Sequence, residues 1–418
     1  MPMTIAEKIL ARASGRQSVS PGEIVEARVD VAMINDITGP ITIEALEQIG
    51  VEGVWDPSRV VIVLDHQAPS ISIEASKEHI RLRRFAAKNN IQNFFDVNEG
   101  VCHQVLPEHG FALPGELIVG ADSHTCTYGA FGCFATGIGS TDMAAVFATG
   151  KLWFRVPESM LIKVEGRLRD RVLPKDVVLR LVGDVGADGA NYRAIEFAGN
   201  GLKGISVGGR MTMCNMGVEM GAKTAIVPAD EITARYLAGR AKWDYQAIYS
   251  DPGASYVEER DYDLSRIEPQ VAIPHHVDKV RPVREVAGVK VDQAFLGSCT
   301  NGRLEDLIEA ARILKGRKIA RGVRMLVVPA SREVYLEALE KGLLQKFVGA
   351  GAMVGSPSCA ACMGGHIGIL GPGEVCISSS NRNFRGRMGS PEAQVYLGSP
   401  ATVAASALKG EITDPRDV

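Results

Sequence analysis

Short apolar runs that end abruptly in polar residues recur along the chain. They are residues 60–64, 117–121, 289–296 and 375–377. Mostly apolar runs of this length are typical of buried strands. The first is followed by Asp65 and His66, and the second by Asp122, Ser123 and His124. In open α/β sheets, sites form beyond the carboxyl ends of the strands, so these polar residues are candidates for chemistry.

Segments with helical periodicity alternate with these runs. Residues 304–314 carry an apolar stripe on one helical face, and Thr4 and Glu7 have the spacing of a capping box at the start of an amphipathic helix. Residues 140–142 (Ser-Thr-Asp) could cap a further helix that runs towards Phe154. The alternation of strands and helices predicts an α/β fold.

The length predicts more than one domain, because 418 residues exceed what one hydrophobic core usually holds. The apolar pattern is broken near Val156 and again between Pro269 and Pro282. We therefore expect three α/β domains of comparable size, at residues 1–156, 157–272 and 273–418.

Composition narrows the class of protein. A hydrophobic content of 46% with 23% charged residues is typical of a soluble globular protein, and a net charge of −3 gives no electrostatic basis for binding nucleic acid or an anionic membrane. No apolar stretch reaches the length of a membrane span, and the N-terminus lacks the apolar region of a signal peptide. Eight cysteines in so long a chain do not indicate a disulfide framework, so we expect a cytoplasmic protein with reduced thiols.

Three cysteines stand out because glycine-rich loops surround them. Cys299 lies in a loop ahead of the predicted helix at 304–314, and Cys359 and Cys362 form a C-x-x-C pair. A redox pair or half of a zinc site, with His366 as a further ligand, are the alternatives to an iron–sulfur cluster. A cluster with three thiolates would leave one iron open to another ligand. The other cysteines, expected to be small buried apolar residues, are Cys102, Cys126, Cys133, Cys214 and Cys376.

Carboxylates stand beside histidines at two predicted strand ends. The pair Asp65–His66 and the segment from Asp122 to His124 each place a carboxylate where it can fix an imidazole tautomer and raise its basicity. The alternative for either motif is polar capping of a turn. His103 is a further histidine in a similar loop. With two Asp/His motifs and this histidine, coincidence is a less satisfactory explanation than a shared chemical role.

Two other segments have equally ordinary alternatives. Arg382 and Arg387 follow a run of serines and could bind substrate carboxylates, or they could belong to a solvated basic loop. Residues 214–221, which include Asn215 and Glu219, could simply be the start of a helix with Glu219 in solvent.

Taken together, these motifs closely resemble the iron–sulfur portion of the aconitase family. The matching segments are residues 36–38, 65–66, the loop around His103, and residues 121–127, 214–221, 297–303, 358–365 and 381–387. The resemblance implies three α/β/α domains around a central iron–sulfur cleft, without the swivelling domain of a single-chain aconitase. It also implies that Cys299, Cys359 and Cys362 hold one [4Fe–4S] cluster per chain.

The resemblance further implies a role for each candidate residue. His66, oriented by Asp65, would protonate the departing hydroxyl of the substrate. The catalytic set would be Asp65, His66, His103, Asp122, His124 and Glu219. The substrate-binding set would be Ser123, Asn215, Asn381, Arg382 and Arg387.

The implied activity is that of a hydro-lyase acting on a small hydroxy di- or tricarboxylate. Because the swivelling domain supplies the serine base in single-chain relatives, the resemblance implies a separate small subunit, in a heterodimer or heterotetramer. Pro40 stands where aconitases have a substrate-contacting glutamine, which favours a substrate other than citrate. An RNA-binding relative would need a basic cleft, which the net charge of −3 does not suggest, and a structural zinc protein is the third alternative.

Overall fold

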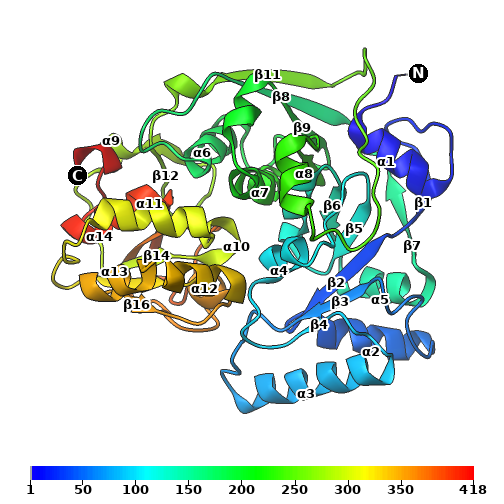
Figure 1. The fold of residues 1–418 in the computed structure, drawn as a ribbon, viewed down its shortest axis with the longest axis horizontal. Helices are drawn as coiled ribbons and strands as arrows, with labels where there is room; N and C mark the ends of the chain where they lie inside the picture. Colours follow the sequence, from blue (N-terminus) through cyan, green and yellow to red (C-terminus); the bar gives the residue numbers. More distant parts are fainter. Residues whose placement is uncertain (1) are drawn as a thin grey trace.

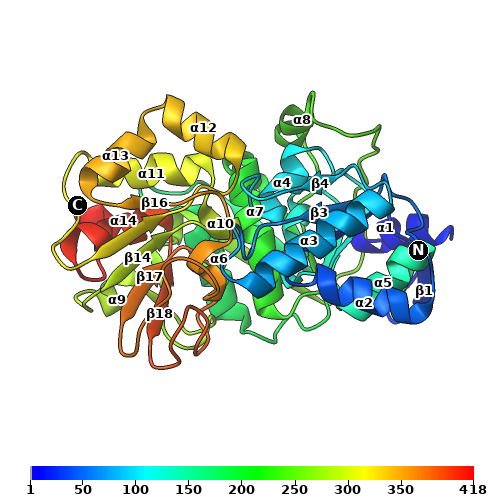
Figure 2. The same cartoon turned by 90° about the horizontal axis from the view of Figure 1, so that it is seen from below.

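The computed structural model describes residues 2–418 and has an α/β architecture, as the sequence predicts. A five-stranded sheet lies towards one end of the molecule and a seven-stranded sheet towards the other (Figures 1 and 2). Helices α6 (Pro174–Val185) and α7 (Val207–Asn215) lie between them. The domain limits at residues 156 and 272 stay a prediction.

The five-stranded sheet is parallel throughout. Its order is β4 (Phe94–Phe95), β3 (Val60–Val63), β2 (Val31–Asn35), β5 (Leu117–Gly120) and β6 (Phe134–Gly137). Successive residues of β2 enter different cores: Val31 and Met33 join one hydrophobic cluster, and Ala32 and Ile34 another. This division follows from the two-residue period of a strand, and it explains why both faces are apolar.

Helices cover both faces of this sheet. The cluster that contains Ala32 also contains Leu46, Leu82 and Phe147 of three helices. These helices are α2 (Gly39–Ile49), α3 (Ile73–Lys88) and α5 (Ser140–Thr149). The cluster that contains Val31 includes Leu106 of α4 (Cys102–Glu108), and it extends into the centre of the molecule. Because helices pack on both faces, the sheet is held rigidly, and so are the ends of its strands from which the polar loops extend.

The helix expected to run from Ser140 towards Phe154 ends earlier, at Thr149. Gly150 takes the left-handed conformation with φ of 70°, which stops the helix. The next residues form β7 (Lys151–Arg155), which pairs with β1 (Ile24–Arg28). In β7, buried Leu152 and Phe154 alternate with exposed neighbours. This alternation has the two-residue period of a strand, not the period of a helix. The N-terminal cap of α5 is Gly139, with no side-chain hydrogen bond, instead of the expected residues 140–142.

The capping box predicted at Thr4 is confirmed. Thr4 caps α1 (Ile5–Ser14), and its side chain accepts the backbone N–H of Glu7 while Glu7 accepts the N–H of Thr4. The apolar residues of α1 pack into the same cluster as β2 and α5. The helix thereby joins the N-terminal segment to the core of the five-stranded sheet.

A four-stranded parallel sheet occupies the middle of the chain. Its order is β10 (Thr224–Ile226), β9 (Ala194–Ala198), β8 (Ser159–Glu165) and β11 (Glu258–Asp263). Met160 and Phe197 belong to the same central hydrophobic cluster as Val31. The middle sheet therefore packs against the centre of the molecule as well.

The seven-stranded sheet is parallel except at one edge, where β12 runs antiparallel to both neighbours. Its order is β13 (Val280–Pro282), β12 (Gln270–Ala272), β18 (Gln394–Gly398), β17 (Val375–Ser378), β14 (Gln293–Leu296), β15 (Arg324–Val327) and β16 (Met353–Val354). The strand predicted at 289–296 comprises only residues 293–296. The helix predicted at 304–314 is α11 (Leu304–Leu314), which packs on one face together with α14 (Pro400–Lys409).

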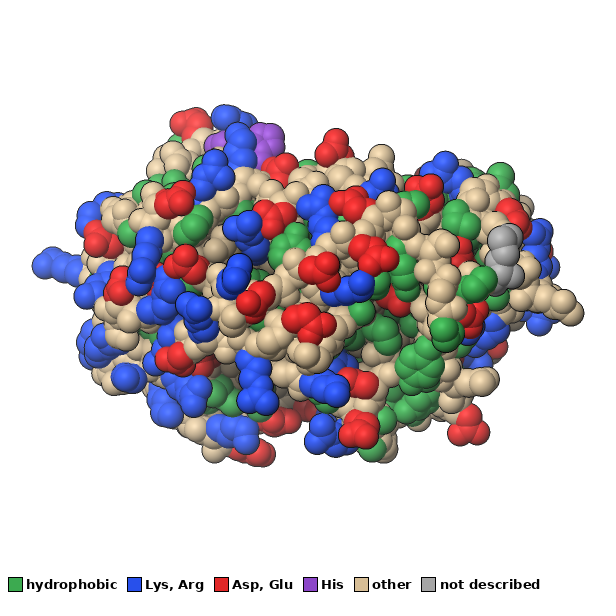
Figure 3. Space-filling model, turned by 90° about the horizontal axis from the view of Figure 1, so that it is seen from above, with side chains coloured by type: hydrophobic (Ala, Val, Ile, Leu, Met, Phe, Trp, Pro, Cys, Tyr) green, Lys and Arg blue, Asp and Glu red, His purple; other side chains and the backbone are tan. Residues whose placement is uncertain are grey.

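The surface carries no large field of one sign on the face that Figure 3 shows, where Lys and Arg are interspersed with Asp and Glu. A membrane-spanning helix requires a long apolar stretch with few charges, and the helices of residues 2–418 contain none. The five cysteines that we expected to be buried apolar residues are buried, and they form no disulfide.

The contact between the 3-10 helix η1 (Ser123–Phe131), which follows β5, and β10 of the middle sheet can be tested at Gly129. A Cβ atom there would lie 1.8 Å from the carbonyl oxygen of Ala225, which is backbone and cannot rotate away. Gly129→Ala should therefore lower the free energy of unfolding by about 3 kcal/mol or more, measured as a fall in the midpoint of thermal unfolding. Gly349→Ala in α13 (Leu343–Ala350) is the control, because its Cβ would meet nothing within 4 Å. Equal midpoints for the two variants would contradict the close approach.

Candidate functional site

The predicted site residues converge on one cavity of about 180 Å³ between the two larger sheets. The cavity lies beyond the carboxyl ends of β3, β5, β14 and β17, where the predicted motifs follow the strands. Its lining comprises Asn35, Ile37, Thr38, His66, Val101, His103, Asp122, Ser123, His124, Cys299, Cys359, Cys362, Met363, Asn381, Arg382 and Arg387. Segments more than 300 residues apart in the sequence thus contribute to a single site.

The three cysteines line this cavity and are buried. Cys299 lies in the short helix α10 (Ser298–Asn301), and Cys362 in the turn η5 (Ala360–Met363), just after Cys359. Ser298 and Ala360 have φ of 75° and 50°, a region that non-glycine residues seldom adopt. Such backbone conformations tend to occur where surrounding structure holds a functional loop in place.

Buried hydrogen-bond donors point at the cysteine sulfurs. The side-chain amides of Asn215 and Asn381 donate to Sγ of Cys299 at 3.2 and 3.5 Å. The hydroxyl of Ser298 donates to Sγ of Cys362 at 3.4 Å, and Arg387 Nη2 lies 3.7 Å from the same sulfur. Arg387 Nε is buried and has no hydrogen-bond partner within residues 2–418. A donor set of this kind fits anionic sulfur, whether thiolate or the sulfide of a cluster.

The three cysteine sulfurs do not lie in the arrangement that a single bound zinc ion would impose. In residues 2–418, the one group of three or more His, Cys, Asp or Glu ligand atoms within 4.8 Å of one another is Asp36, Asp65 and His66. The three cysteine sulfurs are therefore not all within 4.8 Å of one another, although the thiols of Cys359 and Cys362 are close enough to share a hydrogen bond. Tetrahedral zinc would place its sulfurs about 3.8 Å apart, given Zn–S bonds of about 2.3 Å. At least one pair of the three sulfurs is therefore farther apart than one zinc ion would hold it.

The two cysteines of the C-x-x-C pair have opposite acidities. A hydrogen bond from Cys359 holds the pKa of the Cys362 thiol well below its usual range, and Arg387 adds to this effect. The same hydrogen bond, together with burial, raises the pKa of the Cys359 thiol. Burial also raises the pKa of Cys299 to about 11. A thiolate at Cys362 is thus ready to bind metal, and the other two thiols lose their protons when metal binds.

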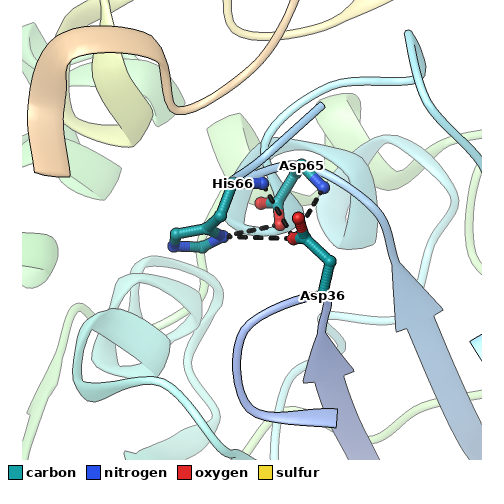
Figure 4. Close-up of side chains that lie close together, drawn as sticks. All are labelled: Asp36, Asp65 and His66. Carbon is teal, nitrogen blue, oxygen red and sulfur yellow. Dashed lines mark hydrogen bonds and ion pairs between the residues drawn. The ribbon is translucent and has the colours of Figure 1, made fainter. Parts of the chain in front are cut away.

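His66, which lines the same cavity, is held by two aspartates (Figure 4). Its Nδ1 lies 2.7 Å from Oδ1 of Asp65 and 3.8 Å from Oδ1 of Asp36, and its Nε2 lies 3.6 Å from Oδ2 of Asp122. The other oxygen of Asp65 accepts the backbone N–H of Cys102 at 2.7 Å. These contacts fix the ring with Nδ1 towards Asp65 and Asp36 and Nε2 towards Asp122.

Asp36 supports this arrangement from behind. Its carboxylate accepts the backbone N–H groups of Asp65 (3.1 Å), His66 (2.8 Å) and Gln67 (2.7 Å), and Oδ2 lies 3.3 Å from Nε2 of His79. Although Asp36, Asp65 and His66 have the composition of a metal site, the Asp36 oxygens are already occupied by these donors. We therefore assign the group to positioning an imidazole.

The pKa values follow from this geometry. Burial alone would lower the pKa of His66, but the charge of Asp65, its hydrogen bond, and the charges of Asp122 and Asp36 raise it to about 10. Burial would likewise raise the pKa of Asp36, but the hydrogen bond from His79, the charge of His66 and the backbone N–H groups hold it well below its usual range. At neutral pH, His66 is therefore a cation with a proton to give.

A second network extends from Asp122. Its Oδ1 lies 3.0 Å from Nε2 of His103 and accepts the backbone N–H of His124 at 2.8 Å. Nε2 of His124 lies 2.9 Å from Oε1 of Glu219, which also accepts Nε–H of Arg382 at 2.7 Å. Burial would raise the pKa of Asp122, but the charge and hydrogen bond of His103 hold it well below its usual range.

Three predicted residues stand behind the cavity instead of lining it. Asp65 lies behind His66, Glu219 lies behind His124 and Arg382, and Asn215 lies against Cys299. Residues 214–221 are the end of α7 and the turn η3 (Met216–Met220), so a helix start with Glu219 in solvent is wrong, because His124 and Arg382 hold Glu219 in the interior. Of the predicted substrate-binding set, the residues that line the cavity are Ser123, Asn381, Arg382 and Arg387.

Several residues that shape the site were given no role from the sequence. Asp36 follows a buried strand directly, and this position was the available signal. Arg303 donates to the carbonyl oxygens of Cys299 and Thr300 and to the side chain of Gln104, and so ties the Cys299 turn to α4. Nothing local in the sequence indicates these contacts, because the partners are distant in the chain.

A model of the Aconitase family (aconitate hydratase) matches residues 7–288 and 279–410. The protein described as "Probable 3-isopropylmalate dehydratase large subunit" of Methanothermobacter thermautotrophicus is 58% identical, covering 99% of each chain. "Probable methanogen homoaconitase large subunit" of the same organism is 52% identical, covering 99% of this chain and 98% of the relative. The crystal structure of Thermococcus kodakaraensis aconitase X aligns with a TM-score of 0.52 at 14% identity, covering 88% of each chain, and shows a similar fold.

The support that Asp36 gives can be tested with Asp36→Asn. The variant should lower the free energy of unfolding by about 1.5–3 kcal/mol at neutral pH, because three backbone N–H groups lose a charged acceptor. The folded-state pKa of Asp36 is depressed, so its contribution is present above the usual carboxylate range and is lost as the pH falls through the folded pKa. Chemical unfolding at pH 7 and in acid measures both effects. Asp170→Asn, at a side chain that is 92% exposed, is the control, and a difference that grows in acid would refute the assignment.

Proposed function

The chain belongs to the aconitase family, and we propose that it is the large subunit of a 3-isopropylmalate dehydratase. This hydro-lyase interconverts 2- and 3-isopropylmalate by the loss and return of water. The observation that carries the proposal is one cavity lined by Cys299, Cys359 and Cys362 together with His66, whose pKa is raised to about 10. The relatives named for this activity, at 58% and 56% identity over almost their whole length, support it.

Membership of the family implies an iron–sulfur cluster, and we propose that Cys299, Cys359 and Cys362 hold it as [4Fe–4S]. When bound, the cluster would supply a Lewis-acidic iron that polarises the carbon–oxygen bond of the substrate. The residues of the chain that would support it are the sulfur-facing donors: Ser298, Asn215, Asn381 and Arg387.

His66 is the proposed acid of the reaction. Hydroxide is a poor leaving group, so a proton must reach the hydroxyl oxygen as the carbon–oxygen bond breaks. Asp65 holds Nδ1, which leaves Nε2 on the side of the cavity. In the forward direction Nε2 gives its proton to the hydroxyl, and in the return step the neutral imidazole takes a proton from the attacking water.

Two arginines and three apolar side chains suit a branched hydroxy dicarboxylate. Arg382 and Arg387 line the cavity and can bind carboxylates through their N–H groups. Ile37, Val101 and Met363 line it as well and could pack against an alkyl group. This lining favours an isopropyl substituent over an additional charged arm.

We place the remaining chemistry on a small subunit. The names of the relatives describe a "large subunit", and elimination also needs a base that removes the carbon-bound proton. The predicted base is a serine of the partner, so this chain alone should be inactive. A heterodimer or heterotetramer and a cytoplasmic location complete the proposal.

A homoaconitase large subunit is the second candidate. Its support is the 52% identity with the homoaconitase relative from Methanothermobacter thermautotrophicus. The two activities share the same elimination, and they differ in whether the substrate carries an isopropyl group or a carboxylate-bearing arm.

Anaerobic assays of the chain co-expressed with its small subunit would separate these candidates. We expect turnover of 2- and 3-isopropylmalate with kcat/KM at least tenfold above that of homocitrate. Cys299→Ser should lose iron, sulfide and activity together, because one cluster corner lacks its ligand. The reverse order of substrates would favour homoaconitase, and a chain with one zinc and no sulfide would refute the cluster.

His66→Asn tests the proposed acid. We expect kcat to fall by about 10²–10⁴, with iron and sulfide contents unchanged, because the asparagine cannot protonate the hydroxyl and His66 binds no metal in the proposal. The exposed His276→Asn is the matched control and should behave as wild type. Wild-type kcat in His66→Asn would rule out His66 as the acid.

A further inference from the structure

Lys175 is a fully buried lysine that the proposed reaction does not use. It is the second residue of α6 and has 0% of its surface exposed. Its ammonium donates to the backbone carbonyl oxygens of Ser379 at 3.0 Å and Ser380 at 2.6 Å. Within residues 2–418, it forms no ion pair with a carboxylate at 4.0 Å or less. The charge is thus placed in the interior with only neutral partners.

This position is unfavourable for a cation on two grounds. An ionised group that leaves water without a counter-charge costs several kcal/mol. The first turn of a helix is also the positive end of its dipole, which repels an ammonium. Burial accordingly lowers the pKa of Lys175 to about 7, opposed first by the charges of Cys299 and Cys362. A nearby negative charge is needed to keep the lysine ionised.

The carboxylates around Lys175 already have donors of their own. Asp176 accepts the backbone N–H groups of Leu173 and Gln270. Asp306 accepts from the backbone of Arg303 and the side chain of Asn301, and Glu219 is held by His124 and Arg382. The other groups whose negative charge would act on Lys175 are Cys299 and Cys362, once metal binding has removed their protons.

The carbonyl oxygens that Lys175 holds belong to the segment that touches the cysteines. The Ser379 hydroxyl accepts the N–H of Gly297 at 3.0 Å, two residues before Cys299. The Asn381 amide donates to Sγ of Cys299 at 3.5 Å and to Oδ1 of Asn215 at 3.0 Å. The ammonium therefore fixes the backbone on which these contacts depend.

We propose that Lys175 is the buried counter-cation of the iron–sulfur cluster and the positioning residue for Ser379 to Asn381. A [4Fe–4S] cluster bound by three thiolates is anionic, and it gains a further negative charge on reduction. A fixed cation in a low-dielectric interior favours the more negative state, so Lys175 raises the reduction potential of the cluster. The inference rests on the cluster of the proposed function, but not on the substrate.

The test compares Lys175→Gln and Lys175→Met with wild type after anaerobic reconstitution. Glutamine keeps N–H donors for the two carbonyl oxygens and removes the charge, whereas methionine removes both. Redox titration of the substrate-free cluster, followed by electron paramagnetic resonance, gives the ratio of reduced to oxidised cluster at a fixed potential. We expect this ratio to fall about tenfold in both variants, a shift of ~59 mV for one electron.

The two variants should differ in how long they retain the cluster. Methionine also frees the Ser379–Asn381 segment, so we expect faster iron loss to a chelator in Lys175→Met than in Lys175→Gln. Lys223→Met is the control, because Lys223 lies over the rings of Phe154 and Tyr192 and should leave the potential unchanged. Thermal unfolding of each cluster-free chain shows that the variants are folded.

Each outcome decides the inference. A wild-type potential in both Lys175 variants would overturn the charge role, and a wild-type potential in Lys175→Gln alone would reduce Lys175 to a hydrogen-bond donor. A wild-type chain that binds no iron would refute the proposed cofactor, and the inference would fall with it. A normal cluster without turnover of isopropylmalate would refute the proposed substrate and leave the inference standing.

Discussion

Charge compensation without water is the constraint on which the cleft depends. Ionised groups buried in the interior lose their hydration, so each needs a partner of opposite sign within the protein. The structure meets this need by alternating acids and bases. In order, the connected groups are Asp36 and Asp65 with His66, then Asp122, His103 and His124, then Glu219 and Arg382. Several members have more than one partner, as Asp122 has in His66, His103 and the backbone of His124, so the acidity of one group depends on the positions of the others.

This network explains why the cleft lies between separate sheets. His66 and Asp122 follow strands of the five-stranded sheet, Glu219 comes from the turn after α7, and Arg382 follows a strand of the seven-stranded sheet. These charged groups therefore come from different parts of the fold. Their positive and negative charges compensate one another only when the parts are packed together. The charge pattern therefore stabilises one arrangement of the sheets, and that arrangement in turn brings the cysteines and His66 to the same cavity.

Local patterns were sufficient to predict where these strands end and which polar residues follow them. Asp65, His66 and Asp122 follow apolar runs that fold as expected, because a buried strand is recognisable from its own residues. The helix expected to reach Phe154 was not predicted correctly, because a single glycine changes the period there. Lys175 and Arg303 are ordinary charged residues in the sequence, and only contacts across about 200 residues reveal their surroundings. The resemblance to the aconitase family supplied roles that no local pattern contains.

The contact between His66 and Asp122 has a consequence for the timing of proton transfer. Nε2 of His66, the nitrogen on the side of the cavity, lies 3.6 Å from Oδ2 of Asp122, and three carboxylates together raise the pKa of His66 to about 10. So basic an imidazole holds its proton firmly, and a strong acid would need a lower pKa. Asp122 is also bound by His103 and by the backbone of His124, so it can lose its contact with His66 without becoming unpaired. A substrate hydroxyl that displaces Asp122 from Nε2 would remove one of the carboxylates that stabilise the cation. Binding would then both present the acceptor and make His66 more acidic, so that the proton becomes available when the leaving group is in place.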